Sequence, residues 1–284
     1  MMLTRSAKRG LTVIQGPLVL MLVVLAGGCA AFRATDANGP RSDVRLYPVG
    51  LADPSARLEE ASLAWYQLSQ HYGVTDRTQV NLDPHTATLR SLPANLTKPI
   101  YLPKVGDAEQ TEEQTRESLR RFIGEWRRLI GAEPEELSLV ERIDEPSGIK
   151  LARYEQRPFR YPLRGGYGNL TIRFRNDRQL VSISSNCLPN AERLQSTLAQ
   201  VNPQVTGEDA VNKLKEQPFT MGQQTITLPP NAVLEPRQLV VYTLPPPGQT
   251  GGLELHLAWE INVTNGPVRT IYFDAVSSQV IAAV

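Results

Sequence analysis

The sequence predicts an α+β protein built from two successive units. A strongly amphipathic helix over residues 112–130 precedes four short segments in which apolar and polar residues alternate. A second, shorter helix begins after Thr206, and four more such segments follow it. A helix followed by antiparallel strands, repeated once along the chain, is the pattern of an α+β fold.

The chain begins with the pattern of an export signal. A basic stretch, Met1–Gly10, precedes an apolar run at 17–26 that is too short to span a bilayer. The run ends in Leu25-Ala26-Gly27-Gly28-Cys29, and small residues before a cysteine resemble a lipobox. We therefore expect residues 1–28 to be a lipoprotein signal peptide and Cys29 to carry lipid. The alternative is an ordinary cleaved signal with an incidental cysteine.

The composition excludes some classes of function. Without the first 28 residues, 27 basic side chains face 29 acidic ones, a balance that lacks the electrostatic footprint of a nucleic-acid-binding protein. A lipidated Cys29 would anchor the exported protein to the cell envelope. Ala30, which follows it, resembles the outer-membrane sorting pattern for a host with two membranes. Cys187 is the only other cysteine, so we expect no intrachain disulfide and a small, apolar packing role for Cys187.

Three segments precede the main helix. Residues 29–53 are predicted to be a tether, because Asn38-Gly39-Pro40 lies within them. Apolar side chains spaced three and four apart predict a helix over 54–72, which Gly73 ends. Prolines recur between residues 74 and 104, which predicts an extended connector or a few edge strands.

The helix over 112–130 has clear end signals and one apolar face. Thr111 and Gln114 match a capping box, and Gly131 matches a C-terminal stop. Its arginines alternate with glutamates at the favourable spacing of four, so we interpret them as a solvated face rather than an anion site. Trp126 lies on the apolar face, whereas Trp259 lies in an alternating segment of the second unit. Both tryptophans are expected to be largely buried, each in a different core.

Eight strands are predicted from alternation and turn signals. Glu145-Pro146-Ser147-Gly148 and Asn265-Gly266 are typical turn sequences. A boundary between the units is expected near 189–203, which gives domains at 54–189 and 190–284. The expected strands are 137–143, 149–156, 169–175, 180–184, 238–244, 253–263, 268–274 and 279–283.

No motif indicates catalysis, so we expect no enzyme, no catalytic residue, no metal and no cofactor. His71, His85 and His256 have no ligand spacing. His256 lies opposite the leucines of its segment and is expected to be solvated or to face a partner. The glycines of Arg164-Gly165-Gly166-Tyr167-Gly168 precede a strand rather than a helix, so we interpret them as a tight turn or bulge.

Two stretches carry a family resemblance. Gln114–Ser185 resembles the fungalysin/thermolysin propeptide module, through Arg153-Tyr154-Glu155-Gln156 and the bend Tyr161-Pro162-Leu163-Arg164-Gly165-Gly166. From Thr206 on, the chain resembles a PepSY domain, through Leu257-Ala258-Trp259-Glu260-Ile261 and Ile271-Tyr272-Phe273-Asp274-Ala275. Val276-Ser277-Ser278 departs from the Thr-Gly that usually follows in that family.

The resemblance implies a fold and a function. The fold is two cystatin-like units, each a helix packed on an antiparallel sheet. In the family, this pair precedes a zinc metalloprotease domain, assists its folding and inhibits it until cleaved; here the chain stops where that domain would begin. We therefore expect a membrane-anchored, non-catalytic protease-binding protein, an inhibitor or folding assistant whose partner is a secreted thermolysin-like metalloprotease. The alternative is a structural or assembly lipoprotein that binds no protease.

The last segment, 279–284, is the candidate for partner binding. It is apolar and β-branched, which suits an added strand in a thermolysin-like cleft. We expect Val280 and Ile281 to pack inside and Ala282, Ala283 and Val284 to project, with the terminal carboxylate attracted by zinc. The alternative is that the segment completes the sheet.

Overall fold

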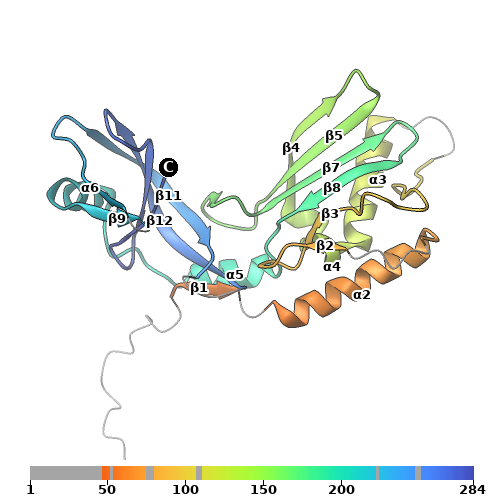
Figure 1. Ribbon diagram of the computed structural model, residues 1–284, viewed down its shortest axis with the longest axis horizontal. Helices are drawn as coiled ribbons and strands as arrows, with labels where there is room; N and C mark the ends of the chain where they lie inside the picture. Colours follow the sequence, from red (N-terminus) through yellow and green to blue (C-terminus); the bar gives the residue numbers. More distant parts are fainter. Residues whose placement is uncertain (1–46, 52–53, 75–79, 107–110, 222–223, 247–250) are drawn as a thin grey trace, which may run out of the picture. The chain divides into compact units, whose positions relative to one another are not determined.

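The computed structural model describes residues 47–51, 54–74, 80–106, 111–221, 224–246 and 251–284. Helices and mainly antiparallel sheets alternate along the chain, which confirms the α+β class (Figure 1). The predicted signal peptide and Cys29 lie outside the described residues.

A four-stranded antiparallel sheet forms the first half of the body. Its strand order is β4-β5-β7-β8, and the four predicted strands of the first unit are confirmed. Leu170, Ile172 and Phe174 of β7 are buried and alternate with more exposed residues, as expected for a sheet covered on one face. The strands are β4 (Leu137–Asp144), β5 (Ile149–Gln156), β7 (Asn169–Arg175) and β8 (Leu180–Ser185).

The covered face packs against the predicted main helix. The helix begins at the confirmed capping box, in which the Gln114 backbone N–H donates to Thr111 Oγ1 (3.3 Å) and the Thr111 N–H donates to Gln114 Oε1 (3.0 Å). It is interrupted at Trp126, whose φ of −106° and ψ of 25° are not helical, so that two helices replace the expected one. They are α3 (Glu112–Glu125) and α4 (Arg127–Ile130), and Gly131 ends α4 at a φ of +80°.

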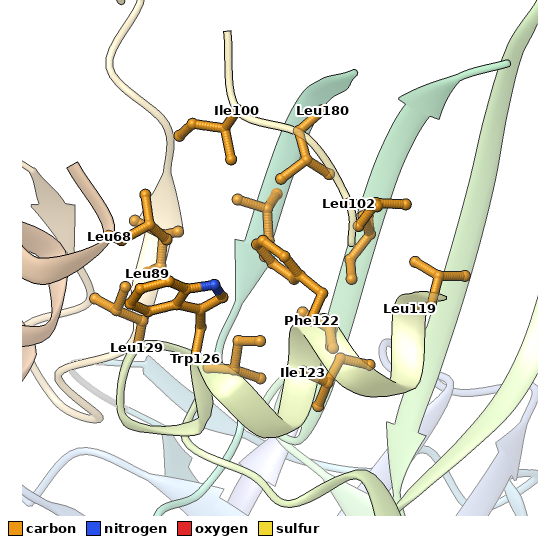
Figure 2. Packing of buried hydrophobic residues seen from close by; sticks show 14 of the residues in the cluster. Leu68, Leu89, Ile100, Leu102, Leu119, Phe122, Ile123, Trp126, Leu129 and Leu180 are labelled. Carbon is orange, nitrogen blue, oxygen red and sulfur yellow. The ribbon is translucent and has the colours of Figure 1, made fainter. Parts of the chain in front are cut away.

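Helix α2 (Ser55–His71) and the segment after it complete this first core. Figure 2 shows Trp126 beside Leu68, Leu89 and Leu129, and it shows Phe122 projecting from α3 into the same cluster. Trp126 is 7% exposed, which confirms its predicted burial.

The predicted connector, residues 74–104, contributes side chains to the first core. Two short strands form in it, β2 (Asn81–Leu82) and β3 (Leu89–Ser91), as the expectation of a few edge strands allowed. Beyond that expectation, Leu89, Ile100 and Leu102 are each 1% exposed and belong to the first core. The prolines break regular structure without keeping the apolar residues between them out of the interior.

A six-stranded sheet forms the second half. The predicted strands are confirmed and lie in the order β14-β13-β12-β11, and two short strands from earlier in the chain join them. β1 pairs with β12, and β6 pairs in parallel with β11. The strands are β1 (Val49–Leu51), β6 (Leu163–Arg164), β11 (Val233–Leu244), β12 (Leu253–Thr264), β13 (Thr270–Asp274) and β14 (Val280–Ala283).

Strand β1 corrects the expectation of a tether that continues to residue 53. Val49 and Leu51 are 4% and 2% exposed, whereas Gly50 between them is exposed. Such alternation is typical of a half-buried strand, and it was too short to be recognised in the sequence.

Helices α5 (Ala191–Leu198) and α6 (Gly207–Glu216) pack on one face of this sheet. Helix α6 was predicted to begin at Thr206, which is its N-cap, whereas α5 was not predicted and lies where a boundary was expected. A hairpin of β9 (Phe219–Met221) and β10 (Gln224–Ile226) follows α6. Trp259 packs against this second core, as predicted, but it is only partly buried; its indole N–H donates to the Val205 carbonyl at 2.9 Å.

Candidate functional site

Strand β14 lies at one edge of the second sheet and contains the predicted partner-binding segment. Ala282 pairs with Tyr272 and Ala283 with Ile271 of β13. Val284 continues the ladder, since its N–H donates to the Thr270 carbonyl (2.9 Å) and its carbonyl accepts from the Thr270 N–H (3.0 Å). The expectation that the last three residues project is therefore wrong, because all three lie alongside β13 in the sheet. Their role in binding stays a prediction.

The outer side of β14 is an unpaired edge among the described strands, although β9 lies close to β14. In an antiparallel ladder, hydrogen-bonded and non-hydrogen-bonded pairs alternate. Val284 and Thr270 form a hydrogen-bonded pair, so the next residue, Ala283, directs its N–H and C=O away from β13. Within the described part of the chain, no strand pairs with β14 on that side.

A cavity adjoins the start of this edge. Its volume is about 580 Å³, and it is lined by the end of α6, the start of β9 and the start of β14. Phe219, Phe273 and Val280 supply apolar walls, and Lys213 and Glu216 supply charges. An unpaired strand edge with a neighbouring cavity of mixed apolar and polar lining is suited to an extended peptide, which would gain main-chain hydrogen bonds and place a side chain in the cavity.

A buried polar cluster lies on the same sheet, centred on Asp274. Asp274 is 0% exposed, and its Oδ2 accepts from the Tyr47 hydroxyl at 2.8 Å and lies 2.7 Å from His256 Nδ1. Its Oδ1 accepts from the backbone N–H groups of Val276 and Ser277, both at 2.8 Å. The cluster therefore fixes the end of β13, strand β12 and the segment before β1 to one another.

The placement of His256 corrects an expectation. The residue is 9% exposed rather than solvated, because Tyr47 packs edge-on against its ring with centroids 5.7 Å apart. Its second nitrogen, Nε2, lies 3.4 Å from Glu254 Oε2. Both ring nitrogens thus contact carboxylates rather than a hydroxyl or thiol, which is the geometry of a structural network and not of a nucleophile–base pair.

The charge states in this cluster follow from burial and hydrogen bonding. Burial and the neighbouring Asp274 carboxylate raise the pKa of Tyr47 well above its usual range, so the phenol remains a donor. Burial alone would raise the pKa of Asp274, but the hydrogen bonds from His256, the two backbone amides and Tyr47 hold it below its usual value. The carboxylate is therefore ionised at neutral pH.

A second polar cluster joins the Gly-rich bend to the sheet. Glu260 accepts from Arg164 Nε (2.9 Å), Gln238 Nε2 (2.8 Å) and the Tyr272 hydroxyl (3.3 Å). Burial would raise the pKa of Glu260, but these donors, Arg164 foremost, hold it below its usual value. The bend has positive φ angles at Gly165, Gly166 and Gly168 (+92°, +88° and +81°), which agrees with the predicted tight turn.

Replacing Gly165 with alanine is expected to detach the bend from the sheet. A Cβ at this position would lie 2.1 Å from the Thr243 carbonyl oxygen, and the positive φ adds strain. We expect the free energy of unfolding to fall by more than about 1 kcal/mol. Gly166→Ala is the matched control, because its φ is also positive but nothing lies within 4 Å of the added Cβ. Thermal unfolding of both variants tests this, and equal midpoints would contradict the close contact.

Sequence reasoning missed both polar clusters. Tyr47 and Asp274 are far apart in the chain, so no local spacing could connect them. The available signal was a charged residue inside an apolar strand, such as Glu260 between Trp259 and Ile261, which requires a buried partner to offset its desolvation.

The remaining predicted features are placed as follows. Cys187 is a free, fully buried thiol, as expected, and burial raises its pKa to about 12. In the portion of the chain that the structure describes, no group of three or more His, Cys, Asp or Glu residues is arranged to hold a metal ion. None of the helices in that portion is long and apolar enough to cross a membrane.

Comparison with known proteins gives no assignment. The sequence matches no protein-family model, and no curated protein matches it.

Proposed function

We propose that the protein is a non-catalytic, membrane-anchored protease-binding protein that offers β14 to a secreted thermolysin-like metalloprotease. The observation that carries this proposal is the unpaired β14 edge, on which the Ala283 backbone groups are directed outward and at whose start the 580 Å³ cavity lies. The helix-and-sheet organisation of each half supports the resemblance to a cystatin-like propeptide pair.

The edge would act by strand addition. An extended segment of the protease would pair with Ala283 through main-chain hydrogen bonds, which are insensitive to sequence. Selectivity would come from a side chain placed between Phe219, Phe273 and Val280. Such binding can block a substrate cleft or hold a folding intermediate in an extended form, which are the two activities of an inhibitor and a folding assistant.

Proline at residue 283 provides the sharpest test. Ala283→Pro removes an N–H that points away from β13, so it deletes no bond of the sheet, and proline is tolerated on strand edges. We expect the inhibition constant against the host's secreted thermolysin-like protease to weaken about tenfold or more, because a binding partner left without its donor loses about 1–3 kcal/mol. The measurement uses the full-length protein in detergent, with circular dichroism as the folding check.

Val140→Pro is the matched control. Val140 is the bulge residue of β4, another edge strand, and lies outside the paired register. This variant should inhibit like the wild type. An unchanged inhibition constant for Ala283→Pro would rule out the β14 edge as the binding site. If the protein bound no thermolysin-like protease of the host, the structural-lipoprotein alternative would be favoured.

The membrane anchor is tested separately. Cys29→Ala should abolish labelling by a radioactive or clickable fatty acid and release the protein from the membrane fraction. Cys187→Ala is the control, because this fully buried thiol is not accessible for acylation and the variant should stay labelled and membrane-bound. Full labelling of Cys29→Ala would refute lipid anchoring at Cys29. The proposed location of the exported protein is the cell envelope, in the outer membrane if the host has two membranes.

A further inference from the structure

The bend between β5 and β7, which contains β6, lines a cavity of its own. The cavity has a volume of about 480 Å³ and is formed by residues 155–169. Phe159, Tyr161 and Tyr167 supply aromatic walls, and all three are partly buried against the core beneath them. The volume lies within the range of about 300–1,000 Å³ typical of ligand pockets.

Three arginines line the cavity, and two of them already have carboxylate partners. Arg157 pairs with Glu155 at 3.1 Å, and Arg164 pairs with Glu260 at 2.9 Å. Arg160 differs, since over the described ranges its guanidinium makes no ion pair. That guanidinium lies 5.3 Å from the centroid of the Tyr161 ring, a cation–π arrangement that orients it.

The Arg160 backbone N–H and two carbonyl oxygens of the bend have hydrogen-bond partners. The Arg160 N–H donates to Gln195 Oε1 of α5 at 2.9 Å. The Gly166 carbonyl accepts from Asn186 Nδ2 (2.6 Å), and the Arg164 carbonyl accepts from Thr243 Oγ1 (2.7 Å). Arg157 and Arg164 are each paired with a carboxylate. Arg160 therefore leaves the cavity with one uncompensated positive charge beside its aromatic side chains.

We propose that this cavity, named here the Arg160 pocket, binds an acidic side chain of the partner protein. Arg160 would bind the carboxylate, a geometry that guanidinium groups favour, and the aromatic walls would hold the neighbouring apolar residue. A single available cation matches the single charge of a carboxylate better than the nearly double charge of a phosphate. The proposal rests on the proposed function, because it assigns the pocket to the same protein partner as β14.

Saturation-transfer difference NMR on the full-length protein in detergent micelles tests this proposal without a protease. The probes are the peptides acetyl-Leu-Glu-Leu-amide and acetyl-Leu-Gln-Leu-amide, which differ only in charge. We expect the Glu peptide to bind about two- to fivefold more tightly, the range for an exposed ion pair. Arg160→Gln should remove that preference, and Arg160→Lys, which keeps the charge, should retain part of it.

Arg128→Gln is the matched control, because this exposed arginine of α4 lies outside the Arg160 pocket and should leave the preference intact. Equal affinities for the two peptides, or a preference that survives Arg160→Gln, would overturn the proposal. So would displacement of the Glu peptide by inorganic phosphate at lower concentration than by acetate. Since no protease is present, the peptide result and the inhibition result can fail independently.

Discussion

Replacing Phe122 with alanine is expected to lower the free energy of unfolding by about 3–5 kcal/mol, the range for a large buried aromatic side chain. Phe122 is 1% exposed and packs between α3 and the covered face of the four-stranded sheet, where it shares a cluster with Ile172 and Phe174. Its removal leaves a cavity that rigid helix–sheet packing cannot close, and the transfer free energy of the ring is lost as well.

Leu63→Ala is the control for this prediction. Leu63 is 53% exposed on α2, so its truncation should change stability by less than about 0.5 kcal/mol. Urea unfolding followed by circular dichroism measures both variants. A loss below 1 kcal/mol for Phe122→Ala would show that α3 does not pack on the sheet as described.

Removal of the Asp274 carboxylate is expected to have an effect of similar size. Asp274→Ala leaves Tyr47, His256 and two backbone N–H groups without their acceptor in the interior. Breaking a buried charged network from one side costs about 3–5 kcal/mol. Asp274→Asn keeps the shape and one acceptor oxygen and should therefore lose less. Urea unfolding of both variants at pH 7 measures the difference, and a loss for Asp274→Ala no larger than that for Asp274→Asn would contradict it.

The same network predicts a pH dependence with a definite sign. The pKa of Asp274 is lower in the folded protein than in the unfolded chain, where it is about 3.9. Its stabilisation is therefore complete above the unfolded value and is lost as the pH falls toward the folded value. The stability gap between wild type and Asp274→Asn should narrow from pH 7 to pH 3. If the stability difference between wild type and Asp274→Asn stayed constant from pH 7 to pH 3, ionisation of Asp274 would not be its cause.

Most strands could be predicted from local pattern, and the exceptions share a physical cause. In β7 apolar and polar residues alternate over all seven positions, and in β12 they alternate except at Ala258, long enough to separate a strand from a helix or loop. β1 and β6 contain only three and two residues, and they become strands because β12 and β11 offer them free edges. Tertiary pairing of this kind leaves no periodicity in the sequence.

Helix α5 shows a second limit. It has only eight residues, its N-cap Asn190 is left-handed with no side-chain cap, and Pro189 precedes it. Those features are typical of a loop, and the helix is stabilised instead by Leu194 and Leu198, which are buried against β1 and β12. The proposed partner-binding segment, 279–284, was predicted as a strand from its β-branched apolar residues, whereas its pairing with β13 depends on a neighbour that local sequence does not specify.

Strand β1 determines how the molecule would respond to a mechanical pull. Hydrogen bonds between antiparallel strands lie perpendicular to the strands, so tension along β1 loads all its bonds to β12 together, in shear. The hydrogen bond from the Tyr47 hydroxyl to Asp274 also links the segment before β1 to the end of β13. Tension from the proposed lipid anchor at Cys29 would thus enter the six-stranded sheet at Tyr47, before it reached α2. The four-stranded sheet would not carry that load, although its strands come between β1 and β11 in the chain.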